Sequence, residues 1–137
     1  EEDIAPGRGL VFVTKPIEGF DLQGCYHYNA GYNYFRSVEG RLLLGGGRHL
    51  DKDTETTTEP GINEVILEAL TEDMHRLICP GQGLEIDQMW TGVMAFGATK
   101  EPIVKKLSDR IALGARLGGM GVALGTEVGY DVAALLV

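Results

Sequence analysis

Cysteines, basic residues and long apolar runs are scarce in this sequence, and each scarcity excludes a class of protein. Only 2 of the 137 residues are cysteines, and neither Cys25 nor Cys79 has a CxxC or Cys/His metal spacing. We therefore expect two buried free thiols and no metal site. The formal net charge is −8, so the chain lacks the basic surface that a nucleic-acid partner requires.

Targeting and membrane signals are also missing. No positively charged segment followed by an apolar run opens the chain, so a signal peptide is not predicted. The apolar C-terminal run is interrupted by Glu127 and Asp131 and is barely long enough to cross a bilayer. We expect no membrane span and a cytoplasmic location. Because the chain opens with Glu1 rather than Met, we expect a fragment boundary there.

The composition is typical of a single globular domain, which we expect to span residues 1–137, with 44% hydrophobic and 23% charged residues. Short apolar or β-branched runs bounded by glycine and proline predict strands. These cover residues 10–14, 25–29, 31–36, 41–45, 84–92 and 110–115. The third and fourth runs form the clearest hairpin, with Gly40 available for the turn.

Two helices complete the prediction. Apolar residues recur at helical spacing up to residue 78, with Thr58 or Glu59 as the cap and Pro60 in the first turn. Residues 102–107 are expected to form a helical or irregular link, and residues 120–137 a buried helix. The order of elements predicts an α+β fold, with a mixed or antiparallel sheet, one amphipathic helix and a buried C-terminal helix.

The sharpest motif is the glycine-rich joint between the last predicted strand and the last helix, residues 115–125 (ARLGGMGVALG). A helix that begins in glycines offers free N–H groups and the positive end of its dipole, which suits an anion or an electron-rich oxygen. A structural alternative is that Gly121, Gly125 and Gly129, four residues apart, only permit close helix-to-sheet packing.

Two nucleotide-binding motifs share part of this pattern. A dinucleotide-binding fold needs another parallel strand and an acidic residue after the helix, and the chain ends at Val137. The spacing Arg116-x-x-Gly119-x-Gly121 resembles the coenzyme A loop of acetyltransferases, although that family continues with further strands. Coenzyme A binding remains an alternative, as does a non-enzymatic binding module whose glycines are purely structural.

Four segments in the same order resemble the C-terminal portion of the D-amino-acid-oxidase-like family, which includes glycine and sarcosine oxidases. The resemblance covers nearly the whole chain. The segments are the Pro6-Gly7-Arg8-Gly9 turn, the 31–46 hairpin (GYNYFRSVEGRLLLGG), the Trp90-x-Gly92 strand and the terminal glycine joint. It implies an oxidoreductase that transfers hydride from a C–N bond of an amine or amino acid to FAD, with most of the flavin held by an absent N-terminal half.

The resemblance also implies roles for particular residues. Tyr32 would face the substrate, and residues Gly118, Gly119, Met120, Gly121, Val122 and Ala123 would contact the flavin through backbone groups. Met94 replaces the arginine that pairs the substrate carboxylate in amino-acid-oxidising relatives, so Arg48 is the candidate replacement cation. No catalytic acid or base is assigned. The isolated chain is expected to bind little or no flavin and to self-associate through surface that the missing half would cover.

Overall fold

The computed structural model describes residues 4–137, which fall into two compact units. The larger unit spans residues 8–93. The smaller unit consists of residues 94–137 and the described residues before Arg8. Each unit has its own packing of strands against one helix. The α+β fold expected from the sequence is confirmed.

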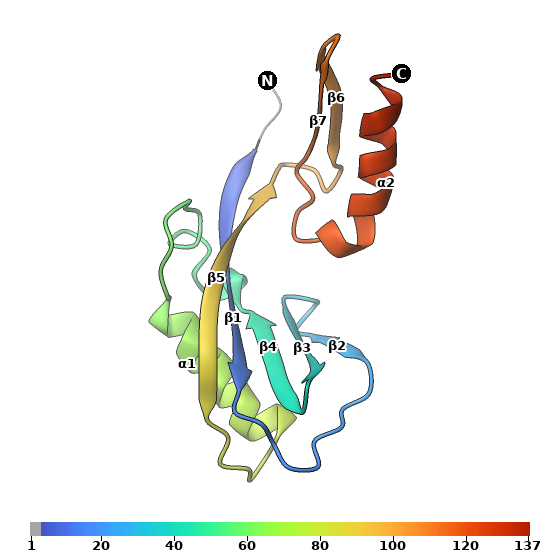
Figure 1. Cartoon of the computed structure of the whole chain (residues 1–137). Coiled ribbons are helices and arrows are strands. Elements are labelled where there is room, and N and C mark those ends of the chain that lie inside the picture. The colour runs from blue at the N-terminus through green and yellow to red at the C-terminus, as the bar shows by residue number, and fades with distance from the viewer. Residues whose placement is uncertain (1–3) are drawn as a thin grey trace. The chain divides into compact units, whose positions relative to one another are not determined.

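The larger unit is built on a five-stranded sheet in the order β2-β3-β4-β1-β5 (Figure 1). The strands are β1 (Ala5–Thr14), β2 (Cys25–Tyr28), β3 (Asn33–Val38), β4 (Arg41–Gly46) and β5 (Ile86–Phe96). β4 pairs antiparallel with both β1 and β3, and β2 pairs antiparallel with β3. The predicted hairpin is therefore confirmed as β3 and β4, with left-handed Glu39 and Gly40 at the turn.

Helix α1 (Glu64–Asp73) covers one face of this sheet and continues into a π-helical turn, η2 (Met74–Ile78). The apolar residues that alternate along β1 and β4 meet the apolar face of α1, as their periods of two and 3.6 require. The buried core consists of Leu10, Phe12, Leu42, Leu44, Ile66, Leu70, Met74 and Cys79. Burial raises the pKa of the Cys79 thiol. The expected burial of Cys25 is wrong, because this residue is exposed on β2.

Helix α1 begins later than the proline signal predicted. Pro60 precedes the helix, and the cap is Asn63, whose Oδ1 accepts hydrogen bonds from the N–H groups of Val65 and Ile66. The Asn63 Nδ2 also donates to the buried carboxylate of Glu55 at 3.0 Å. Asparagine is among the preferred N-cap residues, so this cap carries a local signal that the prediction from Pro60 passed over.

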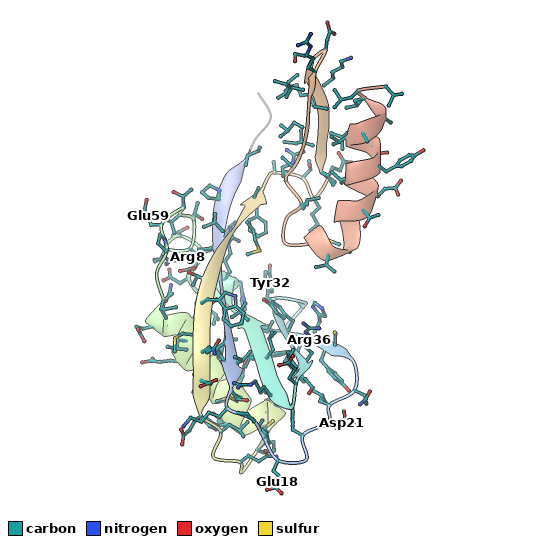
Figure 2. The ribbon with its side chains drawn as sticks, in the orientation of Figure 1. Arg8, Glu18, Asp21, Tyr32, Arg36 and Glu59 are labelled. Carbon is teal, nitrogen blue, oxygen red and sulfur yellow. The ribbon has the colours of Figure 1, made fainter. Side chains whose placement is uncertain are left out.

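The Glu55 carboxylate is the centre of a buried ion pair. Arg8 on β1 donates from Nε and Nη2 to its two oxygens at 3.0 and 2.7 Å. The third guanidinium nitrogen, Nη1, donates to the Glu59 carbonyl, and Figure 2 shows Arg8 and Glu59 close together. Burial opposes ionisation of Glu55, but the hydrogen bonds from Arg8 and Asn63 lower its pKa overall. This network fastens the loop before α1 to the sheet.

The smaller unit contains a two-stranded antiparallel hairpin, β6 (Ile103–Ser108) and β7 (Ile111–Ala115), beside helix α2 (Gly121–Ala134) (Figure 1). The expectation that residues 102–107 form a helical or irregular link is wrong. The alternation in this short run is masked by its two adjacent lysines, whereas pairing with β7 supplies the hydrogen bonds that define a strand.

Close packing of α2 on the hairpin depends on a glycine in the strand. A Cβ added at Gly114 would lie 2.8 Å from Val128 Cγ1 and 2.9 Å from Val132 Cγ2. By contrast, a Cβ at Gly125 or Gly129 would meet nothing within 4 Å. The four-residue glycine spacing of α2 is therefore not what brings helix and hairpin together.

The predicted C-terminal helix is confirmed, but its predicted burial is not. Val128 is the one buried side chain of α2 in the described chain, while Val122 and Tyr130 are exposed. The apolar side chains that led to the prediction of a buried helix therefore lie largely on the surface of the unit. None of the helices in residues 4–137 has the length and apolar composition of a membrane span.

Replacing Glu55 by glutamine leaves the Arg8 guanidinium buried without its carboxylate. We expect Glu55→Gln to lower the free energy of unfolding by about 3 kcal/mol, as breaking a buried ion pair does. Since the pKa of Glu55 is lowered in the folded chain, its contribution is present above the ordinary carboxyl pKa and is lost as pH falls through the folded value. Urea unfolding at neutral and acid pH measures both effects. Glu72→Gln, which breaks an exposed pair with Arg76, is the control and should change nothing measurable.

Two glycine substitutions test the packing of α2. Gly125→Ala should stabilise the chain by about 0.5–1 kcal/mol, because alanine favours the helix and the site is open. Gly114→Ala should destabilise it by about 1–3 kcal/mol through overpacking against Val128 and Val132. Thermal unfolding of the two variants should give shifts of opposite sign. Shifts of the same sign would contradict this account of the interface.

Candidate functional site

The candidate site in the smaller unit is the turn between β7 and α2. Its backbone is left-handed at Arg116, Gly118 and Gly119, with φ of 59°, 57° and 82°. Glycine adopts this conformation without a steric penalty, which explains two of the three positions. The turn ends at Met120, which occupies the cap position of α2 and has no side-chain oxygen to satisfy the helix amides.

Half of the backbone N–H groups predicted to contact a flavin already have acceptors within the unit. The Gly118 N–H donates to the Ala95 carbonyl at 3.0 Å, which fastens the turn to the end of β5. The Met120 N–H donates to the Leu117 carbonyl at 2.8 Å, and the Ala123 N–H donates to the Met120 carbonyl at 3.1 Å. These three groups shape the turn rather than offering donors to a ligand.

The other half remain available. Within residues 4–137 the structure gives no acceptor to the N–H groups of Gly119, Gly121 and Val122. Helix α1 provides a contrast, because the side chain of Asn63 satisfies its first amides. With methionine in place of such a cap, α2 presents its free donors and the positive end of its dipole to whatever lies in front of the helix.

An open hollow of about 450 Å³ lies at this turn. Its lining is mostly backbone and apolar side chains, from Met94, Ala95, Ala115, Arg116, Leu117, Gly118, Gly119, Gly121 and Val122. The Met94 sulfur lies 3.4 Å from where a Cβ on Gly119 would be, so a side chain there would crowd the lining. All three residues with free N–H groups line this hollow.

In the larger unit, Tyr32 forms a stacked pair with His49. Their ring centroids are 4.3 Å apart with an interplanar angle of 28°, and Tyr32 is 56% exposed. Figure 2 shows Tyr32 at the end of the sheet opposite to Glu18 and Asp21. The pair therefore presents an aromatic surface at this end of the sheet, with the tyrosine ring outermost.

A strained turn holds this pair. Asn29 and Ala30 are both left-handed, with φ of 52° and 54°, and Tyr32 N–H donates back to the Asn29 carbonyl at 3.0 Å. The Asn29 Nδ2 lies 2.9 Å from His49 Nε2. The other ring nitrogen, Nδ1, is buried with no hydrogen-bond partner in the described residues.

Arg48 and His49 lie in a short 3₁₀ helix, η1 (Arg48–Asp51), which starts directly after β4. The preceding Gly47 is left-handed, with φ of 74°, and its N–H donates to Asn33 Oδ1 at 2.9 Å. Asn33 is buried, so η1 is anchored to the start of β3. Arg48 itself is half-buried, with Nε inside the unit rather than in solvent.

The structure thus places the residues singled out from the sequence in two groups. One group lines the hollow of the smaller unit: Met94, Gly118, Gly119, Gly121 and Val122, with Met120 at the end of the turn and Ala123 in the first turn of α2. Tyr32 and Arg48 belong to the larger unit. Sequence reasoning missed His49 as a partner of Tyr32. It also placed Asn29 and Gly31 at the ends of two predicted strands, although both are left-handed and belong to the turn between β2 and β3. His, Cys, Asp and Glu side chains of residues 4–137 form no cluster of three that could hold a metal ion.

Comparisons with known proteins give the family. A model of the family described as FAD dependent oxidoreductase (DAO) matches residues 1–135. Two solved structures share the fold at 18% sequence identity: an L-proline dehydrogenase from P. horikoshii, with a TM-score of 0.78, and an iminodiacetate oxidase from Chelativorans sp. BNC1, with a TM-score of 0.74. A search of curated proteins found no match.

The two likenesses cover 99% of this chain but only 36% and 37% of the solved chains. The chain therefore corresponds to little more than a third of their length. Neither the acetyltransferase alternative nor the non-enzymatic module finds support in these comparisons. With the family model matching nearly every residue, the chain belongs to the FAD-dependent oxidoreductase family.

Proposed function

We propose that this chain supplies the substrate-facing sheet and one flavin-contacting turn of an enzyme that oxidises a C–N bond of an amine or amino acid. The observation that carries the proposal is the set of three acceptor-free N–H groups, on Gly119, Gly121 and Val122, that line the hollow. Membership of the FAD-dependent family supports flavin as their ligand.

The hollow fits one edge of a flavin ring. The ring system is flat and largely apolar, with carbonyl oxygens and a nitrogen along its pyrimidine side. Glycines and apolar side chains suit the flat faces, and the free N–H groups suit the acceptors. When bound, the flavin supplies the hydride-accepting chemistry, which no side chain of this chain can provide.

The residues at the turn have an electrostatic role in this scheme. Negative charge gathers on the pyrimidine side of a flavin as it is reduced, and fixed N–H donors stabilise such charge without reorganising. Met94, Ala95 and Leu117 give the same region an apolar lining. The proposal requires no acid or base from this chain.

Tyr32 is proposed to face the substrate from its stacked position on His49. The solved relatives are named for L-proline and iminodiacetate, and each of these compounds contains the C–N bonds that the proposal requires. Met94 cannot pair a carboxylate, so a substrate carboxylate would depend on another cation, for which Arg48 is the candidate. A substrate without a carboxylate fits equally well with the apolar lining at Met94.

Further polypeptide is proposed as the main partner. Val122, Tyr130 and Leu136 on or beside α2 are exposed large apolar side chains. Because this chain matches only about a third of its solved relatives, we propose that a further FAD-binding portion covers this surface and holds the adenosine end of the cofactor. Without that portion, the 137-residue chain should self-associate, which light scattering detects.

Flavin binding is the direct test. The full-length protein that contains this chain should purify with the visible absorption bands of oxidised flavin, and anaerobic addition of an amine or amino-acid substrate should bleach them. The 137-residue chain alone should take up little or no FAD in a calorimetric titration. A full-length protein that binds coenzyme A but no flavin would overturn the proposal.

The role of Tyr32 can be tested separately. Tyr32→Ala should raise KM about tenfold with a smaller change in kcat, because the lost aromatic contact of ~1.4 kcal/mol acts on substrate binding. Tyr26→Ala is the matched control, since Tyr26 is also an exposed tyrosine of this sheet, 41% accessible, and has no assigned role. Equal KM changes in both variants would argue against a substrate-facing Tyr32.

A further inference from the structure

Arg116 is in a backbone conformation that its residue type rarely adopts. Its φ is 59°, and it lies directly before the Leu117-Gly118-Gly119 part of the glycine turn. A residue with a Cβ persists in the left-handed region only where its surroundings hold it there. The contacts of the arginine side chain are therefore part of what determines the shape of this turn.

Those contacts run from the turn to the loop between β5 and β6. Arg116 Nε donates to the Glu101 carbonyl at 2.9 Å, and Nη2 lies 3.4 Å from Thr99 Oγ1. A planar guanidinium can hold both acceptors in one fixed geometry, which a lysine ammonium cannot reproduce. The side chain thus fastens the start of the turn to a neighbouring loop.

The turn is also fastened two residues later. The Gly118 N–H donates to the Ala95 carbonyl at 3.0 Å, and the Met120 N–H closes the turn on Leu117. Between and after these anchors lie Gly119, Gly121 and Val122, which line the hollow and whose N–H groups have no acceptor in the described chain. Their direction is set by the backbone path through Arg116 and Gly118, because none of them has a side-chain or backbone acceptor in the described chain to orient it.

We propose that Arg116 is a positioning residue: by bonding Glu101 and Thr99 it holds the left-handed backbone that presents the N–H groups of Gly119, Gly121 and Val122 to the ligand. The inference rests on the proposed flavin site and adds to it. Arg116 acts through geometry, since its guanidinium bonds the adjacent loop. Donors fixed in advance stabilise ligand charge better than donors that must be ordered on binding.

Variants of Arg116 in the FAD-loaded full-length protein test this role. Arg116→Lys keeps the positive charge but loses the planar guanidinium that bonds two acceptors, and Arg116→Gln loses both the charge and the guanidinium. Arg116→Gly removes the side chain while still allowing the left-handed backbone. Arg110→Gln, in the turn between β6 and β7, is the control for loss of a positive charge in the same unit.

The readout is the dissociation constant for sulfite, read from the loss of flavin absorbance. Sulfite adds its lone pair to N5 of the oxidised ring, and the displaced electron pair rests on the pyrimidine side, where the free N–H groups are proposed to lie. All three Arg116 variants should weaken sulfite binding by about tenfold or more, as small misplacements of donors do. Arg110→Gln should match the wild type.

Thermal unfolding separates positioning from simple support of the fold. Arg116→Gly relieves the backbone conformation, so its melting temperature should stay close to the wild-type value while sulfite binding weakens. Thr99→Ala, which removes one guanidinium partner without touching the turn, should weaken sulfite binding about twofold to threefold, within the range of a single lost hydrogen bond. This second variant keeps the test valid if an Arg116 variant fails to fold.

The outcomes distinguish the inference from the function on which it rests. A wild-type protein that holds no flavin would remove the proposed function itself. A wild-type flavoprotein whose Arg116 variants and Thr99→Ala all bind sulfite with wild-type affinity would overturn the positioning role alone. Weaker sulfite binding in all three Arg116 variants, with wild-type sulfite affinity in Arg110→Gln, would support the positioning role.

Discussion

The first N–H groups of a helix need acceptors, and the two helices of this chain meet that requirement in opposite ways. In α1 the requirement is met internally, because Asn63 accepts from the amides of Val65 and Ile66. In α2 the cap position is held by Met120, whose side chain makes no capping hydrogen bond. A helix end left open in this way, beside an apolar hollow, is where a protein can bind a ligand with backbone alone.

The residue that caps α1 also holds together a network of polar contacts in the larger unit. The Asn63 side chain both caps the helix and donates to Glu55, which Arg8 clamps through two hydrogen bonds. The segment from Gly47 to Asn63, which contains η1, is thereby fixed at its far end, while Asn33 fixes Gly47 at its near end. His49 lies within the fixed stretch and supports the Tyr32 ring. An exposed tyrosine thus obtains a defined position from buried polar contacts rather than from burial of its own.

The parts of the fold that follow from local pattern were predictable. The periodicity of apolar residues and the turn residues of the sequence predict the β3–β4 hairpin, the amphipathic helix and the terminal helix. Three features were predicted wrongly. The start of α1 is set by the Asn63 cap rather than by Pro60, and the strand character of β6 depends on its pairing with β7. The exposure of α2 is the third: its apolar composition is compatible with a core helix and with a helix whose partner surface is supplied by other polypeptide.

At the candidate site the sequence points to one segment but cannot show which of its backbone groups are free to bind a ligand. Six consecutive residues were predicted to contact the cofactor through backbone groups, and which three have free N–H groups is decided by acceptors such as the Ala95 carbonyl, far away in sequence. Arg116 is a second case in which the sequence alone does not determine what a residue contacts. An arginine three residues before a glycine matches a phosphate-binding loop when only spacing is considered. In the fold its guanidinium bonds Glu101 and Thr99 in the adjacent loop, and the proposed positioning role rests on these contacts. Spacing places a charge near a site, and only the hydrogen-bond partners of that charge determine whether it acts on the ligand or on the backbone that meets it.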